Sequence, residues 1–252
     1  QLGTEDATNM SLGVAIDAGD WTWTIDYYNI EVEDRIALGA NIDFLDALNY
    51  AGSSSYDSVS AALAGLDAAG TINRQEYLGL DDLAQFRFFT NGFSTTTKGL
   101  DLVGRVDFAA LSGDSTVTLA FNYNDTTVDN RGSINPISDG RVEALEDQLP
   151  SIKGNVAWAH TQGRFRTLVR ANYYGGWKST SNDYNVGATI MVDAQVSYQV
   201  SDELELVLGV DNLFDEYPDS NPGQGGVGQL YPEDSPFGFN GGSWYLQGRY
   251  SF

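Results

Sequence analysis

The sequence contains no cysteine, which excludes a disulfide framework, a thiolate metal site and a cysteine nucleophile. It has a single histidine, so transition-metal ligation would rest on carboxylates alone. Basic residues are also scarce: 13 lysines and arginines stand against 35 aspartates and glutamates, which gives a formal net charge of −22. Phosphate binding needs a basic surface, and we therefore expect no nucleic-acid partner.

Long apolar segments are absent as well. No run of about 18 apolar residues occurs, which excludes a membrane-spanning helix. The N-terminus, beginning Gln1-Leu2-Gly3, is not a signal peptide. If the chain forms a membrane barrel, its export signal was removed or lies outside this sequence. The residues that are abundant, 28 glycines and 12% aromatics, favour β-structure over helix.

The clearest positive signal is a repeated alternation of apolar and polar residues, which is typical of β-strands. In one segment Ile190, Val192 and Val196 alternate with Asp193 and Gln195. Several segments exceed the usual strand length and match the roughly 9–11 residues of a tilted transmembrane strand. The nine predicted strands are Leu12–Asp17, Trp21–Ile36, Leu100–Phe108, Thr116–Asn124, Gly154–His160, Arg164–Tyr174, Thr189–Val200, Leu204–Asp211 and Trp244–Phe252.

The connections between these strands alternate in length. Short turns are predicted at residues 17–20, 110–114, 161–163 and 201–203, and long loops at 37–85, 129–152, 178–187 and 214–243. All six prolines fall in the long loops, so none interrupts a predicted ladder of hydrogen bonds. Short turns on one rim and long loops on the other are the layout of outer-membrane barrels.

The first long loop carries helix signals. Asp57 is positioned to N-cap a helix in which Val59, Ala62, Leu63 and Leu66 share a face, with Gly70 at its end. The residues leave two interpretations open: a small helix packed on the rim, or an apolar loop without a helix.

Alternation alone does not separate a barrel from a soluble β-sandwich. Aromatic residues near the predicted strand ends match the girdles that meet lipid headgroups, and these are Trp21, Trp23, Trp158, Tyr173, Trp177, Tyr198 and Trp244. The polar face carries both signs of charge, at Asp101, Arg105, Arg164, Arg166, Arg170, Asp193, Glu205 and Arg249. A water-filled lumen tolerates such charges better than a packed core does. A membrane barrel is therefore favoured, with a soluble all-β protein as the alternative.

Two motifs near the end of the chain resemble a known family. Residues 211–218 read Asp-Asn-Leu-Phe-Asp-Glu-Tyr-Pro, which is similar to the N-L-F-D-x-x-Y motif of TonB-dependent receptors. The last strand ends at Phe252 with Tyr250 and Leu246 on the same face, which resembles the C-terminal signal for outer-membrane assembly. Outside Ala37–Gln85, other stretches resemble the same family in the same order, at 9–13, 25–30, 34–36, 88–91, 97–102, 149–150 and 153–154.

The resemblance implies an all-β fold, an antiparallel transmembrane β-barrel of the 22-stranded type with long extracellular loops. It also implies an N-terminal plug and a TonB box, the short segment that engages TonB, neither of which this sequence contains. The number of predicted strands is odd, whereas single-chain bacterial barrels close with an even number. This supports the expectation that part of the barrel is missing from the sequence. We therefore expect residues 1–252 to be the C-terminal part of a TonB-dependent receptor β-barrel, either a fragment or one piece of a split receptor.

No residues combine into a recognisable active site, so we predict neither an enzyme nor a cofactor. His160 lies beside a predicted turn and is assigned a turn or interfacial role. A membrane hydrolase would need a base beside a serine, and only His160 could serve. The acidic clusters at 81–82, 143–147, 211–219 and 233–234 are interpreted as a solvated anionic rim, with Ca²⁺ binding as the alternative. The glycine-rich segment 223–228 is interpreted as a flexible loop rather than a phosphate cradle.

Arg164, Arg166 and Arg170 form a basic row on the polar face. We expect these residues to pair with Asp193 or other carboxylates of the wall. The alternatives are that they guide an anionic substrate or pair with an acidic plug.

The resemblance implies active transport of a scarce nutrient (a siderophore, cobalamin, glycan or peptide) across the outer membrane of a Gram-negative bacterium. The implied partners are the TonB complex, the lipid bilayer with its lipopolysaccharide, and the barrel-assembly machinery acting on the strand that ends at Phe252. Ala37–Gln85, Asp129–Ile152 and Phe214–Ser243 would form part of a substrate vestibule, with no single ligand residue predicted. The alternatives are a secreted or surface β-sheet binding module and a passive porin.

Overall fold

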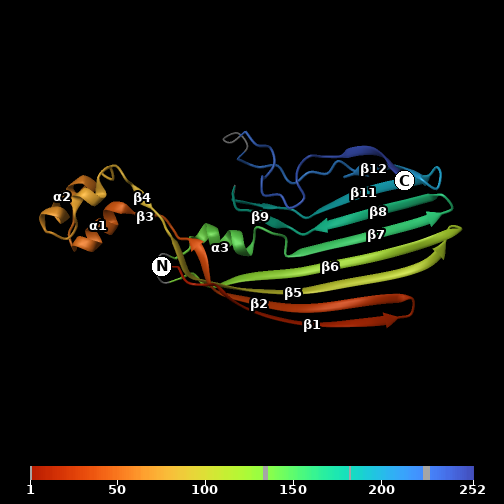
Figure 1. Ribbon diagram of the computed structural model, residues 1–252, viewed down its shortest axis with the longest axis horizontal. Helices are drawn as coiled ribbons and strands as arrows, with labels where there is room; N and C mark the ends of the chain where they lie inside the picture. The colour runs from red at the N-terminus through yellow and green to blue at the C-terminus, as the bar shows by residue number, and fades with distance from the viewer. Residues whose placement is uncertain (1, 133–135, 182, 224–227) are drawn as a thin grey trace. The chain divides into compact units, whose positions relative to one another are not determined.

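The computed structural model describes residues 2–132, 136–181, 183–223 and 228–252. Nine long strands dominate it: β1 (Asp6–Ala18), β2 (Trp21–Leu38), β5 (Phe89–Ala110), β6 (Gly113–Asn130), β7 (Ile152–Gln162), β8 (Phe165–Tyr174), β11 (Thr189–Gln199), β12 (Leu204–Asp211) and β13 (Ser243–Tyr250). They form one sheet in chain order, with β1 and β13 at its edges (Figure 1). All nine predicted strands are therefore confirmed.

The strand ends differ from the sequence prediction. β5 has 22 residues and begins at Phe89, well before the predicted start at Leu100, in a stretch where the sequence shows no regular alternation. The last strand was predicted to reach Phe252, and this is wrong: β13 ends at Tyr250. Phe252 instead lies edge-on to the Tyr250 ring, with 5.2 Å between the ring centroids.

The pairing register assigns each side chain to one of two faces. Val156, Ala171 and Val192 follow one another across β7, β8 and β11, so they share what we call the apolar face. On the opposite face, which we call the polar face, the neighbours in the register are Asn155 and Asn172. Large side chains of the apolar face are exposed, among them Leu208 at 53% and Leu246 at 70%. The period-two pattern thus predicted the faces correctly.

The short turns lie where they were expected. The β1–β2 turn contains Gly19 at φ 64° and the β7–β8 turn contains Gly163 at φ 57°. Between β5 and β6, Leu111 and Ser112 both adopt positive φ, at 48° and 61°. Two consecutive residues of this conformation match the right-handed twist of the strands that they join.

The chain divides into two compact units. One comprises Gln1–Ala7, Val32–Ser94 and Asp129–Asp139, and the rest of the chain forms the other. The first unit contains β3 (Ile42–Asp43), β4 (Gln85–Phe86), α1 (Phe44–Gly52), α2 (Val59–Ala68) and the 3₁₀ turn η1 (Arg74–Tyr77). Its core comprises Phe44, Leu48, Ala62, Leu63 and Leu66. No described helix has both the length and the apolar character needed to cross a membrane.

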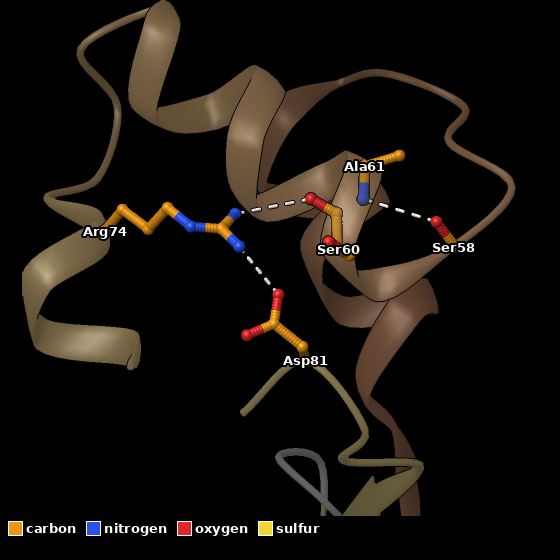
Figure 2. A network of polar contacts seen from close by, with 5 residues as sticks. All are labelled: Ser58, Ser60, Ala61, Arg74 and Asp81. Atoms are coloured by element: carbon orange, nitrogen blue, oxygen red, sulfur yellow. Dashed lines mark hydrogen bonds and ion pairs between the residues drawn. The ribbon is translucent and has the colours of Figure 1, made fainter. Parts of the chain in front are cut away.

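Helix α2 confirms the helix predicted in the first long loop, and the alternative of an apolar loop is wrong. Its N-cap is Ser58 rather than Asp57: the Ser58 side chain accepts a hydrogen bond from Ala61 N at 3.2 Å. Figure 2 shows how the following segment is tied to this helix. Arg74 Nη2 lies 2.7 Å from Asp81 Oδ1, and Arg74 Nη1 donates to the carbonyl of Ser60 at 3.4 Å.

In the second unit, the long connections contain α3 (Asp139–Glu146), β9 (Trp177–Ser179) and β10 (Tyr184–Val186). β9 and β10 pair with each other as a small separate hairpin. Trp177 lies in this hairpin and is only 5% exposed. Its assignment to an aromatic girdle is therefore wrong, because the chain has already left the large sheet at Tyr174.

Candidate functional site

A chain of polar side chains crosses the polar face of the sheet. Asn155 Nδ2 on β7 donates to Asn172 Oδ1 on β8 at 2.5 Å, and Asn172 Nδ2 donates to Asp193 Oδ2 on β11 at 3.1 Å. On the next two strands, Asn122 Nδ2 on β6 donates to Asp101 Oδ1 on β5 at 2.7 Å. Because these residues lie on adjacent strands and the same face, their short side chains reach one another directly.

The polar face is hollowed beside this chain of hydrogen bonds. The hollow encloses about 490 Å³. Six of its polar lining residues are Asp26, Asp101, Asn122, Lys153, Asn155 and Asn172. Within the described parts of the chain, the Lys153 ammonium has no ion-pair partner, although two carboxylates line the same hollow. The site therefore offers amide donors and acceptors together with charges of both signs, which suits a polar molecule rather than an apolar one.

The basic row is placed on the polar face as predicted, but its pairing was predicted wrongly. Arg164 Nη1 donates to the carbonyl of Val200 at 2.9 Å. Arg166 and Arg170 are exposed, and neither has an ion-pair partner among the residues that the structure describes. Asp193 stands opposite Arg170 in the register, yet its carboxylate accepts from Asn172 and from Asn212 N instead.

The motif at residues 211–218 forms a compact turn after β12. Asn212 is 4% exposed and adopts φ 51°. Its side chain bonds the Glu216 backbone twice: Nδ2 donates to Glu216 O at 2.8 Å, and Oδ1 accepts from Glu216 N at 2.9 Å. Gly242 N, just before β13, donates to Asp215 Oδ1 at 2.7 Å. The motif thus connects the end of β12 to the start of the last strand.

Several residues of the acidic clusters serve as acceptors within the loops. Asp219 Oδ2 accepts from Gly187 N at 2.7 Å, and Asp234 Oδ1 accepts from Ser179 Oγ at 2.9 Å. A hydrogen bond to Asp215 is the main cause that raises the pKa of the Tyr217 hydroxyl. In the described ranges, no group of three or more acidic or histidine side chains is close enough to hold a metal ion. The predicted flexible loop at 223–228 falls mostly on residues 224–227, which lie outside the described residues.

Lys178 joins two of the long connections. Its ammonium pairs with Glu143 of α3 and lies 2.9 Å from Asp183 Oδ1. The hydrogen bond with Glu143, followed by that with Asp183, raises the pKa of Lys178, while Lys178 lowers the pKa of the Asp183 carboxyl. The sequence showed the long loops but could not show this pairing, since Glu143 and Lys178 are 35 positions apart.

His160 lies near the β7–β8 turn, as expected, and it has a serine partner that the sequence did not reveal. Its Nδ1 lies 2.9 Å from Ser115 Oγ on β6, and Trp158 stacks on the imidazole with 5.6 Å between ring centroids. Ser115 is 2% exposed and His160 is 7% exposed. Both side chains are enclosed by their neighbours, so the pair packs the rim of the sheet.

Comparison with known proteins is consistent with this architecture. A family model described as "TonB dependent receptor-like, beta-barrel" matches residues 1–213. No curated protein sequence matches the chain. Solved structures match over its whole length. The outer membrane transporter YddB from Escherichia coli has a TM-score of 0.63 at 11% identity, and the match covers 100% of this chain and 33% of that chain.

Two further structures are similar. The FrpB iron transporter from Neisseria meningitidis has a TM-score of 0.62 at 12% identity, with 100% of this chain and 32% of that chain covered. A ferric enterobactin receptor from Pseudomonas aeruginosa, PfeA, has a TM-score of 0.60 at 16% identity, with 98% and 31% covered. At such identities the likeness shows the fold alone. The chain spans about a third of the length of these proteins.

Proposed function

This chain belongs to the TonB-dependent receptor-like β-barrel family and is part of an outer-membrane barrel, and from this we propose that the protein carrying it takes up a scarce nutrient with energy from the TonB complex. The chain would supply the C-terminal strands of the barrel, and the plug and the TonB box would lie in the remainder of the protein. Its apolar face would meet lipid, and its polar face would meet the water-filled lumen.

One observation carries the proposal: the polar face holds a hydrogen-bonded wall with an open hollow of about 490 Å³. Amide and charged groups are costly to bury in a packed core, but they are stable where water can solvate them. It can exchange hydrogen bonds with a polar cargo that passes along it. The exposed guanidinium groups of Arg166 and Arg170 add a positive row to the same face, which favours cargo that carries anionic groups.

The class of nutrient is part of the proposal, and it rests on the structural relatives. The similar structures include transporters or receptors for iron, copper and ferric siderophores, as their names state. A metal chelate with anionic groups fits the arginine row better than a neutral glycan does. We further propose that β13 and Phe252 engage the barrel-assembly machinery, because this strand ends the sheet with an unpaired edge.

Uptake measurements test the proposal. In a strain that lacks the gene, we expect reduced accumulation of one member of a panel of labelled siderophores, cobalamin, glycans and peptides. The plasmid-borne gene should restore accumulation, and deletion of TonB or addition of a protonophore should abolish it again. Uptake that persists without TonB would indicate a passive porin. Binding without uptake would indicate a surface binding module.

A further inference from the structure

The apolar face of the sheet carries a second hollow, of about 460 Å³, which transport through the lumen does not use. Two rows of side chains that run across the strands border it. The first row is Phe121, Gly154, Tyr173 and Ile190, which are paired in register on β6, β7, β8 and β11. The second row is Leu119, Val156 and Ala171. Gly154 and Ala171 are the smallest members, so the space opens above them.

The side chains around this hollow are suited to hydrocarbon. Leu102 and Trp23 line its far part on β5 and β2. The Trp23 indole lies over Gly104, where an added Cβ would come within 2.4 Å of the ring. Asn155 also borders the hollow, but its side chain is engaged with Asn172 on the polar face. The surface that lines the hollow is almost wholly apolar, so the desolvation of a polar ligand would go largely uncompensated.

The dimensions of the hollow match one leaflet of a membrane. It extends from β5, which the Trp23 indole overlies, to β11, across four strand spacings of about 4.8 Å each, which gives a length of about 19 Å. Transmembrane strands tilt by about 45°, so a groove that runs across them projects about 14 Å onto the membrane normal. Half of a hydrocarbon core about 30 Å thick is about 15 Å. A single lipid chain that lies obliquely along the sheet would therefore fit.

We propose that this hollow is a binding site for one acyl chain of an outer-membrane lipid. Bulk lipid covers the whole apolar face. At this position, by contrast, the acyl chain lies between Phe121 and Tyr173 on one side and Leu119 and Val156 on the other. Contact on both sides and on the floor increases the apolar area that the chain buries, and the hydrophobic gain scales with that area. The site is independent of the cargo and of the TonB complex.

A glycine substitution fills the hollow without disturbing the sheet. A Cβ at Gly154 would have Tyr173 Cβ at 3.7 Å and Ala120 O at 3.8 Å as its nearest neighbours, which are ordinary contacts. Gly154→Leu therefore places a side chain where the acyl chain would lie. Gly248→Leu is the matched control, because Gly248 lies on the same face opposite Leu206 and outside the hollow, with its nearest atom at 3.9 Å.

The test uses the native protein that carries this chain, reconstituted in phosphatidylcholine vesicles that contain a phosphatidylcholine with a diazirine on its acyl chain. After irradiation, mass spectrometry maps the labelled residues, and heat-modifiable gel migration confirms folding. We expect Val156 and Tyr173 to be labelled several-fold more than Val196 and Leu208, which are exposed on the apolar face outside the hollow. Gly154→Leu should remove this excess, and Gly248→Leu should leave it unchanged.

Even labelling along the apolar face would overturn the proposal, since it would show bulk lipid only. An excess that survives in Gly154→Leu, or that disappears in both variants, would overturn it too. Absence of label from the whole face would overturn it by showing that this face does not meet lipid. Uptake assays measure transport separately, so a negative labelling result would overturn the lipid site without affecting the test of the proposed function.

Discussion

Tyr245 on β13 lies directly over Gly209 on β12, where an added Cβ would be 2.2 Å from Tyr245 Cζ. The hydroxyl group of Tyr245 reaches past the glycine and donates to Gln195 Oε1 on β11 at 3.1 Å. One side chain thereby links three strands. Tyr28 on β2 covers Gly99 on β5 in the same way, with its hydroxyl 3.5 Å from Asn122 Nδ2 on β6.

Replacing Gly209 with alanine should destabilise the last hairpin, because the new methyl group and the Tyr245 ring cannot occupy the same space. We expect a cost of about 1 kcal/mol, the low end of the range for overpacking, because the end of the exposed Tyr245 side chain can move aside. Tyr245→Phe keeps the ring and loses one exposed hydrogen bond, so it should cost about 0.5–1.5 kcal/mol or less. Urea unfolding of the native protein in detergent micelles measures both. Gly248→Ala is the control, and equal stability of Gly209→Ala and Gly248→Ala would contradict the steric explanation.

Asn212 contributes both a side-chain bridge to Glu216 and a left-handed backbone conformation, and two substitutions separate these contributions. Asn212→Gly keeps the backbone conformation but loses both hydrogen bonds, at about 0.5–1.5 kcal/mol each, because water can reach the backbone of the exposed Glu216. Asn212→Ala adds the left-handed strain of about 1–2 kcal/mol. We therefore expect stability to fall in the order wild type, glycine, alanine in the same unfolding assay. A glycine variant as stable as the wild type would show that the bridge to Glu216 contributes nothing.

Asp193 and Arg170 should respond very differently to substitution, although they are neighbours in the register. Asp193→Ala leaves Asn172 Nδ2 and Asn212 N without their acceptor, and we expect it to cost about 1–3 kcal/mol per unpaired group. Arg170→Ala removes an exposed side chain that has no ion-pair partner among the described residues, so stability should change by about 0.5 kcal/mol or less. Comparable losses for the two variants would indicate that Arg170 and Asp193 are paired in solution.

The β9–β10 hairpin should be best ordered between acidic and strongly alkaline pH. Lys178 has a pKa raised above its ordinary 10.5, so its contribution is complete below that value and is lost as the pH rises through the raised pKa. Asp183 has a pKa lowered below its ordinary 3.8, so its contribution is present above that value and is lost as the pH falls through the lowered pKa.

Hydrogen–deuterium exchange of residues 177–186, corrected for intrinsic rates, measures how well the hairpin is ordered at each pH. We expect faster exchange at both extremes of pH, and Asp183→Asn should remove most of the acidic change. The effect should be modest, because the Asp183 side chain is 83% exposed and salt screens exposed pairs. Exchange in Asp183→Asn that still increases as strongly in acid would contradict the assignment to this ion pair.

The helix in the first long loop shows how far local patterns reach. Val59, Ala62, Leu63 and Leu66 shared a predicted face, and three of them are buried in the core of the first unit. The N-cap was missed by one residue, because serine and aspartate are both good caps and adjacent here. The partners of the helix were not predictable, since Phe44 and Leu48 lie in a different helix, α1.

By itself the sequence determined the nine strands, the two faces and the short-turn and long-loop rims, because alternation with period two assigns side chains to faces before any strand is paired. Only the tertiary structure decided which side chains meet. Asp193 binds Asn172 rather than Arg170, Trp177 is buried in a hairpin rather than placed at a girdle, and Gly154 opens a hollow between Phe121 and Tyr173. These relationships depend on the register between strands and on contacts between distant loops, which no local pattern encodes.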